Sequence, residues 1–282
     1  MKNIIPKKAY KIKFLNILGL QPIRYIIAKL ALNFRKNKFK NINNSNLNLR
    51  GIEFFYSSEE EIKKLTEDVK NLKSILLDKK EFKNFHPKRI TLIDGSTIVD
   101  RIEFSFEEME KSDIFQNLCK YLSGNKIWDL LSNDFGSKIY LCPDQIIWFD
   151  KITYGQSSDV SQWHTDTFFD NYKYWFFPEG ISNKKNIPMN YLPKSHKFSF
   201  KRIIFEYFCS LTMKKNTDLS WRLNKHFFKI FGIKPVNNEC PEFTGFLANT
   251  HGFHSRATVK NGATRIQLHM TIRPTDPFSF FT

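Results

Sequence analysis

The first half of the chain has apolar residues at the spacing of helices. Ser58 and Glu61 form a capping box, and an apolar stripe follows it at intervals of three and four residues: Ile62, Leu65, Val69, Leu72 and Leu76. This pattern predicts a helix over about 59–78. Ser105 and Glu108 begin a second helical pattern, which ends near Gly124. Between the two, residues 90–102 predict a hairpin that turns at Asp94-Gly95.

From residue 138 the pattern changes to short β-rich runs separated by turn residues. These runs cover 138–142, 146–154, 161–168, 173–177, 188–193, 243–250, 253–260 and 263–273. A segment rich in Phe and Lys, about 198–231, interrupts them with a helical pattern. Several short strands after a helical first part predict an α+β fold, in which a β-sandwich or barrel is flanked by helices.

The N-terminal segment is basic and amphipathic. After Pro22, an apolar stripe recurs at helical spacing and consists of Ile23, Ile26, Ile27, Leu30 and Phe34. Pro22, Arg24 and Lys29 interrupt this region, so it does not reach the run of about 18 apolar residues that spans a bilayer. Two alternatives remain open: the helix lies on an anionic membrane surface, or its stripe packs on the body of the protein. The Asn-rich residues 37–48 predict a linker.

Charge separates this segment from the rest of the chain. The formal net charge is +16, and residues 1–52 contain twelve basic residues and no acidic one. The remaining residues hold 44 − 12 = 32 basic against 28 acidic side chains, a net charge of +4. A hydrophobic content of 41% excludes disorder for most of the chain. The four cysteines form no C-x-x-C pair, which argues against a zinc ribbon or a disulfide framework. We therefore expect a cytoplasmic protein. The basic N-terminal segment adds the alternative of peripheral contact at the inner face of a membrane.

Histidines and an aspartate form the strongest chemical signal. His164 and Asp166 are two residues apart within a β-like run, so both side chains project from one face and can bind the same metal ion. About ninety residues later, His251 and His254 offer a further imidazole. Two histidines and one carboxylate on one face of a metal leave the opposite positions open, which suits non-haem Fe(II) and oxygen activation.

The last β-like runs add an arginine. Asn261-Gly262 is a tight-turn signal, and residues 265–272 alternate between polar and apolar side chains. A simple hairpin would pair His254 with His269 and place Arg265 on the same face as His254. The four strand residues between His254 and the position that would pair with Arg265 correspond to about 13 Å. A five-carbon dicarboxylate, together with the arginine side chain, could bridge this gap between a metal and Arg265. A guanidinium binds a carboxylate through two parallel hydrogen bonds.

Four motifs follow one another in this half of the chain: Gln162 to Asp166, Tyr191 to Lys197, Thr250 to His254, and Arg265 eleven residues after His254. Together they resemble the phytanoyl-CoA dioxygenase family of Fe(II)/2-oxoglutarate-dependent oxygenases, over about 138–275. The resemblance implies a double-stranded β-helix (jelly roll) with helices packed on one sheet. In such a fold consecutive strands tend to lie in opposite sheets, which would replace the simple hairpin. Arg265, Gln267 and His269 would then point inward.

The resemblance also implies roles for particular residues. His164, Asp166 and His254 would be the catalytic iron ligands, Arg265 would bind the far carboxylate of 2-oxoglutarate, and Trp175 is a looser match to an aromatic that lines the cosubstrate pocket. The implied cofactors are Fe(II), 2-oxoglutarate and O2. Since related halogenases lack the carboxylate, the intact Asp166 favours hydroxylation.

The other histidines have less defined roles. His251 is an alternative ligand to His254, which is preferred for its spacing to Arg265. His196 fits a structural hydrogen bond better than a metal ligand, and His86 and His226 fit surface positions. Asn249 stands where the family often has Asp, a position that would not bind the metal itself.

These observations predict an enzyme that hydroxylates an aliphatic C–H of a small-molecule or lipid-like substrate and releases succinate and CO2. One alternative is a jelly-roll metalloenzyme that does not use 2-oxoglutarate, for which Arg265 would have no role. Another is a non-catalytic protein associated with membrane or nucleic acid, although no base-reading motif favours nucleic acid. The predicted organisation is a basic N-terminal segment, 1–50, and a dioxygenase domain, 51–282. That domain comprises a helical support (51–135) and a jelly-roll core (138–275) with a helical insert (198–238).

Overall fold

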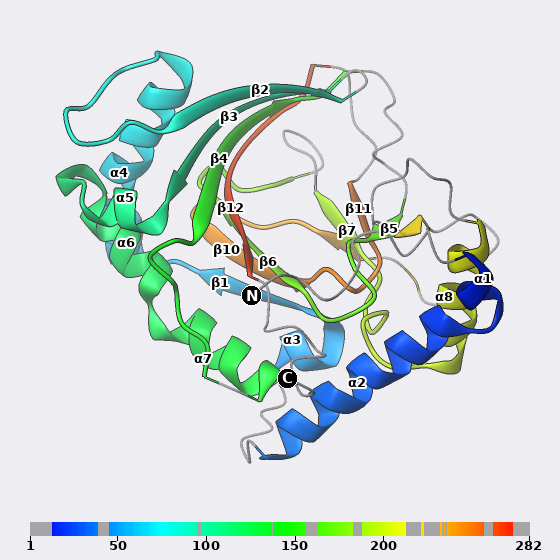
Figure 1. Cartoon of the computed structure of the whole chain (residues 1–282). Helices are drawn as coiled ribbons and strands as arrows, with labels where there is room; N and C mark the ends of the chain where they lie inside the picture. The colour runs from blue at the N-terminus through cyan, green and yellow to red at the C-terminus, as the bar shows by residue number, and fades with distance from the viewer. Residues whose placement is uncertain are drawn as a thin grey trace.

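The chain folds into helices around two antiparallel sheets (Figure 1). The computed structural model describes residues 13–38, 45–94, 97–136, 138–155, 163–182, 188–212, 221–222, 232, 234, 236–256 and 262–272. The larger sheet has the order β1 (Ile52–Tyr56), β10 (Thr244–Asn249), β6 (Tyr172–Phe177), β12 (Thr264–Ile272), β4 (Ile146–Thr153), β3 (Thr97–Ser105), β2 (Lys88–Asp94). The smaller sheet has the order β8 (Trp221–Arg222), β5 (His164–Thr165), β11 (His254–Arg256), β7 (Met189–Tyr191), β9 (Val236–Asn238).

From β4 to β7 and again from β9 to β12, successive strands alternate between the two sheets, whereas β7, β8 and β9 all lie in the smaller sheet. β4, β6, β10 and β12 belong to the larger sheet, whereas β5, β7 and β11 belong to the smaller one. His254 therefore pairs with Tyr191 and His164, and His269 pairs with Trp148 and Trp175. The simple hairpin that would pair His254 with His269 is wrong. The expectation that consecutive strands lie in opposite sheets is confirmed for β4 to β7 and for β9 to β12, but not for β7 to β9.

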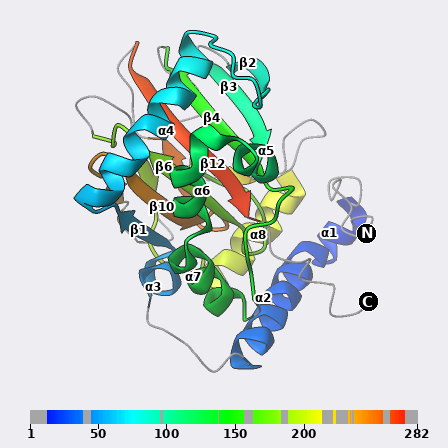
Figure 2. The same cartoon turned by 90° about the vertical axis from the view of Figure 1, so that its left-hand side faces the viewer.

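Four helices cover the outer face of the larger sheet, as Figure 2 shows. They are α4 (Glu59–Leu77), α5 (Phe106–Glu110), α6 (Gln116–Ser123) and α7 (Asn125–Phe135). Buried apolar residues of these helices, such as Leu72, Leu118 and Leu131, pack with Phe104, Phe149 and Leu268 of the sheet. Burial of this apolar surface is the main stabilising term of the fold. It leaves the opposite face of the same sheet free to carry polar groups.

The helical predictions are partly confirmed. α4 matches the predicted helix at 59–78, and both hydrogen bonds of the Ser58–Glu61 capping box are present. The hairpin at 90–102 is the β2–β3 pair. The single helix expected from Ser105 to Gly124 is instead α5, a short 3-10 helix (Asp113–Phe115) and α6. Ser112 is extended there, with φ −90° and ψ 123°, and interrupts the helix.

Several other expectations were wrong. Residues 138–142 form no strand, because the main chain of Ile139 hydrogen-bonds the Ser132 hydroxyl at the end of α7. β1 was not expected, and neither was α3 (Asn46–Arg50) within the predicted linker. Of the run 161–168, only His164–Thr165 is strand among the residues placed there. In the predicted helical segment 198–231, α8 covers Phe200–Thr212, Trp221–Arg222 is strand β8, and 223–231 lie outside the described residues.

The N-terminal helices α1 (Lys13–Ile17) and α2 (Leu20–Lys38) pack beside α8 (Figure 1). Polar side chains attach α2 to the body. Lys29 Nζ lies 2.7 Å from Asp170 Oδ2 and donates a 2.8 Å hydrogen bond to the His196 carbonyl, and Gln21 donates to Glu206 at 3.0 Å. Of the two alternatives for the apolar stripe, packing on the body does not hold for Ile23, Leu30 and Phe34, which are exposed. Within the described part of the chain, no helix combines the length and apolar character needed to cross a membrane.

The Lys29–Asp170 pair leads to a stability prediction. Both side chains are only 7% exposed, so Lys29→Ala leaves a buried carboxylate without its cation and should lower the free energy of unfolding by about 3–5 kcal/mol. Lys64→Ala, which removes an exposed pair with Glu60 on α4, should cost less than about 1 kcal/mol. Urea unfolding measures both variants. Equal losses would show that the Lys29 pair does not attach α2.

Candidate metal centre

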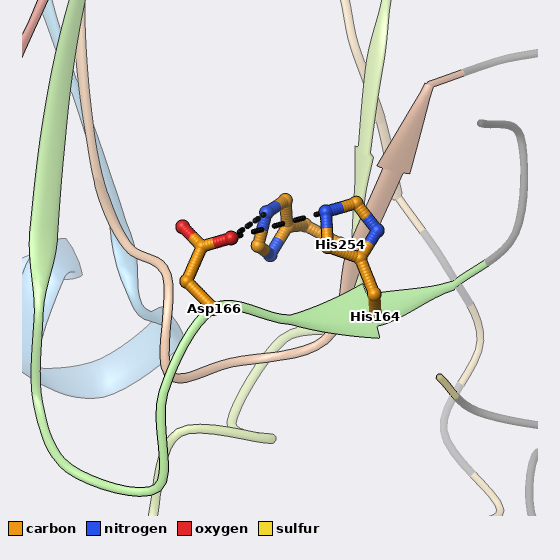
Figure 3. Close-up of side chains that lie close together, drawn as sticks. All are labelled: His164, Asp166 and His254. Atoms are coloured by element: carbon orange, nitrogen blue, oxygen red, sulfur yellow. Dashed lines mark ion pairs between the residues drawn. The ribbon is translucent and has the colours of Figure 1, made fainter. Parts of the chain in front are cut away.

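Three side chains converge at the end of strand β5. His164 lies in β5, Asp166 follows that strand directly, and His254 begins β11, where it pairs with His164. One nitrogen or oxygen atom of each residue lies within 4.8 Å of the others, a spacing at which all three could hold one metal ion (Figure 3). Asp166 Oδ1 is 3.9 Å from His164 Nε2 and 3.7 Å from His254 Nε2. The i, i+2 spacing in the sequence thus brings two of these residues together, and the β5–β11 pairing adds the third.

The surroundings favour the protonation states that metal binding requires. His254 Nδ1 lies 3.0 Å from the Gly252 carbonyl oxygen, so it carries the proton and leaves Nε2 available as the ligand atom. Burial lowers the pKa of His254, although Asp166 opposes this effect, and the ring is therefore neutral. Burial alone would raise the pKa of Asp166, but its electrostatic interactions with the His254 ring and the Lys173 ammonium group outweigh burial and hold that pKa well below its usual range.

Lys173 is the cation nearest to this carboxylate among the ion pairs of the described residues. Its Nζ lies 2.9 Å from Asp166 Oδ2. Lys173 belongs to β6 of the larger sheet, so the ion pair joins the two sheets at the candidate metal centre. A buried carboxylate needs such a partner to stay charged. Sequence analysis missed Lys173, although it stands two residues before Trp175, on the same face of the strand.

The loop after β7 holds β11 in place. Phe253 N donates to Ser195 Oγ at 2.8 Å, Ser195 Oγ donates to the Leu192 carbonyl at 2.6 Å, and Leu192 N donates to the Phe253 carbonyl at 2.9 Å. A Cβ atom on Gly252 would collide with the hydroxyl of Tyr191. The motif from Tyr191 to Lys197 therefore has a physical role, since it fixes the segment that presents His254.

His251, His196 and His86 do not belong to this group of possible ligands. His251 is buried, stacks on Tyr25 with ring centroids 5.6 Å apart, and its Nδ1 lies 3.1 Å from the Thr167 carbonyl oxygen. Of the two alternatives, His254 and not His251 completes the group. His196 makes the structural hydrogen bond that was expected, to the Asn48 carbonyl at 3.1 Å, and His86 is exposed as expected.

Asn249 and His226 are the last two positions singled out in the sequence. Asn249 donates to Asp170 and lies outside the group of three possible ligands. His226 is outside the described residues, so its expected surface position stays a prediction.

A cavity of about 210 Å³ adjoins two of the three candidate ligands. His164 and His254 line it together with Arg265 of β12 and Trp175 of β6. Arg265 is 6% exposed, and its guanidinium lies 5.8 Å from the Tyr154 ring centroid and 5.9 Å from that of Phe177. The arginine and the tryptophan singled out in the sequence thus share one cavity with the candidate metal ligands, although they come from the opposite sheet.

A second polar cluster lines the same cavity. Arg101 binds Asp150 through two hydrogen bonds, of 2.7 and 2.9 Å, and His269 Nε2 donates to Asp150 Oδ2 at 2.9 Å. The three residues lie on the inner face of β3, β4 and β12, where Arg101 and Gln267 are both register partners of Asp150. Sequence analysis expected Gln267 and His269 to point inward and missed Arg101 and Asp150. A single aspartate in the apolar run 146–153 was the available signal.

Some polar atoms of the cavity lining have no hydrogen-bond partner within the described part of the chain. They are Gln267 Oε1, His269 Nδ1 and Ser255 Oγ. Buried polar atoms of proteins are normally satisfied by protein, water or ligand. The cavity is therefore suited to a ligand with hydrogen-bonding groups.

Comparison with known proteins identifies the fold. A scan against protein-family models and a search of curated proteins both give no match. Among solved structures, the apoform of EctD from S. alaskensis aligns with a TM-score of 0.50 at 12% identity, over 81% of this chain and 78% of that chain. The non-heme alpha ketoglutarate dependent epimerase SnoN from nogalamycin biosynthesis aligns with a TM-score of 0.47 at 12% identity, over 89% and 88%. The likeness to EctD shows a shared fold of helices and antiparallel sheets.

The convergent ligands lead to a metal-binding prediction. The intact chain should bind one Fe(II) or Co(II) ion under anaerobic conditions, as measured by equilibrium dialysis with metal analysis. Loss of groups that merely orient a ligand costs about tenfold to hundredfold in affinity, so His164→Ala and His254→Ala should each lose at least that much. The exposed His86→Ala is the matched control. Unchanged affinity in either ligand variant would exclude this metal centre.

The Asp150 cluster leads to a prediction about pH. Burial alone would raise the pKa of Asp150, but hydrogen bonds from His269 and Arg101 lower it from 3.8 to about 2. Because the pKa of Asp150 is lower in the folded chain than in the unfolded chain, its carboxylate stabilises the fold above about pH 4. This contribution, about 2 kcal/mol, is lost as the pH falls towards 2. The Tm difference between the wild type and Asp150→Asn should therefore be constant from pH 5 to 7 and shrink below pH 4. A difference independent of pH would contradict the assignment.

Proposed function

We propose that this chain is an Fe(II)- and 2-oxoglutarate-dependent dioxygenase that hydroxylates an aliphatic C–H of a small-molecule or lipid-like substrate. One observation carries the proposal: His164, Asp166 and His254 converge beside a cavity that also contains the buried Arg265. Such an enzyme needs two features in one cavity: ligands that bind one side of a metal ion, and an arginine that binds a carboxylate.

The strand order supports the fold assigned in this proposal. β4, β6, β10 and β12 in one sheet and β5, β7 and β11 in the other alternate along the chain as the strands of a double-stranded β-helix do. We assign the chain to the phytanoyl-CoA dioxygenase family on the order and spacing of its four motifs. EctD, whose fold this chain shares, has also been solved with bound Fe and with 2-oxoglutarate and 5-hydroxyectoine.

The donor set fits Fe(II). Two neutral imidazoles and a charged carboxylate are the ligands of open facial iron sites, and both the hydrogen bond from His254 Nδ1 and the low pKa of Asp166 keep these donors ready. When bound, iron and 2-oxoglutarate supply the oxidising chemistry, with succinate and CO2 as products. The protein provides position, charge and exclusion of water. The presence of Asp166 supports hydroxylation, because the carboxylate occupies a position that a halide would otherwise take.

Arg265 supports 2-oxoglutarate as the cosubstrate. Its guanidinium is buried between aromatic rings within the cavity, where it can bind the far carboxylate of a dicarboxylate. A jelly-roll metalloenzyme with another chemistry would have no need for this buried cation. Trp175 lines the same cavity and gives it an apolar side. Gln267 and His269 add hydrogen-bonding atoms for the ligands that fill it.

The proposal predicts succinate formation. Protein purified without oxygen and reloaded with Fe(II) should form succinate from 2-oxoglutarate when oxygen and candidate substrates are added. His164→Ala should abolish the activity. Arg265→Gln should raise KM for 2-oxoglutarate by about tenfold to hundredfold, because a charge-assisted hydrogen bond contributes about 1.5–3 kcal/mol.

Arg89→Gln, on β2 outside the cavity lining, is the matched control for the loss of an arginine. Its KM for 2-oxoglutarate should equal that of the wild type. A normal KM in Arg265→Gln would remove the cosubstrate role of Arg265.

A further inference from the structure

Helices α1, α2 and α8 have an unusual distribution of polar and apolar side chains. In α1, Asn16 is 1% exposed, whereas Phe14, Ile17 and Leu18 are 72%, 59% and 66% exposed. A helix on the surface of a soluble protein normally buries its apolar side and exposes its polar side. Here the sides are exchanged.

The same exchange occurs in α2. Gln21, Tyr25 and Lys29 lie on the buried side, at 1%, 0% and 6% exposure. Ile23 and Leu30, seven residues apart and so on one side of the helix, are 51% and 61% exposed. Polar contacts to Asp170 and Glu206 hold the buried side on the body. Specific polar contacts therefore hold α2 so that Ile23, Leu30 and Phe34 of its apolar stripe are turned away from the body.

In α8 the buried side carries an ion pair. Arg202 Nη2 lies 2.9 Å from Glu206 Oε1, and both side chains are 0% exposed. Phe200 and Phe208, eight residues apart, are 74% and 48% exposed. Nearby Phe198, which stacks on Tyr25 of α2, is 52% exposed. All three helices thus expose apolar groups.

These side chains are concentrated at one place. Ten of the eighteen large apolar residues that are exposed in the described part of the chain belong to residues 14–34 and 198–208. The helices contact one another, and Tyr207 Oη donates to the Ile17 carbonyl at 3.1 Å. We name this surface the α1–α2–α8 face, defined by Phe14, Leu15, Ile17, Leu18, Ile23, Leu30, Phe34, Phe198, Phe200 and Phe208. An exposed apolar area of this kind marks an interaction site.

The charge of the same segments identifies the partner. Residues 1–52 hold twelve basic and no acidic residues, and residues 198–238 hold eight basic and two acidic ones. Subtracting both from the totals leaves 44 − 20 = 24 basic against 28 − 2 = 26 acidic residues, a net charge of −2. The whole positive excess of the chain therefore lies in the segments that contain this face. Arg202 and Glu206 of these segments neutralise each other in a buried ion pair, which leaves this excess unchanged.

We propose that the α1–α2–α8 face docks on the surface of an anionic lipid bilayer, with its apolar side chains among the acyl chains and its flanking Lys and Arg residues at the headgroups. Apolar insertion combined with basic charge is what peripheral helices use to bind membranes. The combination favours a bilayer over nucleic acid, which offers no apolar phase for ten such side chains. The inference does not depend on the proposed enzymatic function.

Docking would place the membrane on the far side of these helices from the turn that follows the candidate metal ligand. Arg202 Nη2 donates to Thr165 Oγ1 at 3.4 Å, Arg24 lies 4.6 Å from the Phe168 ring centroid, and Lys29 pairs with Asp170. The helices of the face thus contact the segment 165–170, which contains Asp166. A membrane-bound protein would hold its candidate site at a fixed orientation to the bilayer.

Vesicle co-sedimentation of the full chain tests this proposal. Because the buried side of α2 carries Lys29 and Gln21, removal of residues 1–40 would disturb the body, and point substitutions at exposed positions are the better probe. The wild type should bind vesicles containing about 30% phosphatidylglycerol more tightly than pure phosphatidylcholine vesicles, and added salt should weaken the binding. The double variant Leu30→Gln/Phe200→Gln should bind about tenfold or more weakly, given the free energy of burying such side chains.

The matched control is Leu92→Gln/Ile93→Gln, which changes two exposed apolar residues of the β2 strand, remote in sequence from the face. It should bind vesicles like the wild type, and thermal melting should show that both double variants fold. Absence of wild-type binding to anionic vesicles, or equal loss in both double variants, would overturn the proposal. So would a concentration-dependent dimer in light scattering that the Leu30→Gln/Phe200→Gln variant abolishes, because the face would then bind a second copy of the chain.

Discussion

The antiparallel pairing of β5 with β11 is the interaction on which the candidate site depends. It places His254 opposite His164, with ring centroids 4.4 Å apart, although the two residues are ninety positions apart in the chain. Both strands are short, so their own ladder is a weak constraint. The position of β11 is also fixed by the segment from Tyr191 to Ser195, through the hydrogen bonds of Ser195 and Leu192 to Phe253 and the close approach of Gly252 to Tyr191.

A second constraint is the charge buried between the sheets. Asp150 lines the cavity and Asp166 pairs with Lys173, which also lines it, so each carboxylate is held charged by a cation of the larger sheet, Lys173 or Arg101. The outer face of that sheet is apolar and is covered by α4 to α7. Burial of this face offsets the free-energy cost of the buried polar contacts on the inner face. One sheet thus separates a hydrophobic core from a polar interior. This division allows the candidate metal ligands, an arginine and hydrogen-bonding groups to lie close together between the two sheets.

Elements with a strong local signal were predictable. The capping box at Ser58 defined α4, and alternation of polar and apolar residues defined β12 and the inward direction of its polar side chains. Features that depend on distant contacts were not. β1 forms because β10 offers it an edge, and residues 138–142 are held by Ser132 instead of by a strand. The orientation of α2 could not be predicted from the local sequence either. It depends on the buried contacts of Lys29 with Asp170 and of Gln21 with Glu206. His164 and Asp166 were recognisable from their spacing, whereas Lys173 became recognisable only through its contact with Asp166.

The central claim is that one cavity holds a metal ion and a dicarboxylate together. Calorimetric titration of 2-oxoglutarate into the anaerobic Fe(II)-loaded chain measures this directly. The structure predicts one binding site per chain that is weakened by removal of the metal and, separately, by Arg265→Gln. Absence of 2-oxoglutarate binding by the iron-loaded wild type, or binding that is indifferent to both the metal and Arg265, would contradict the account.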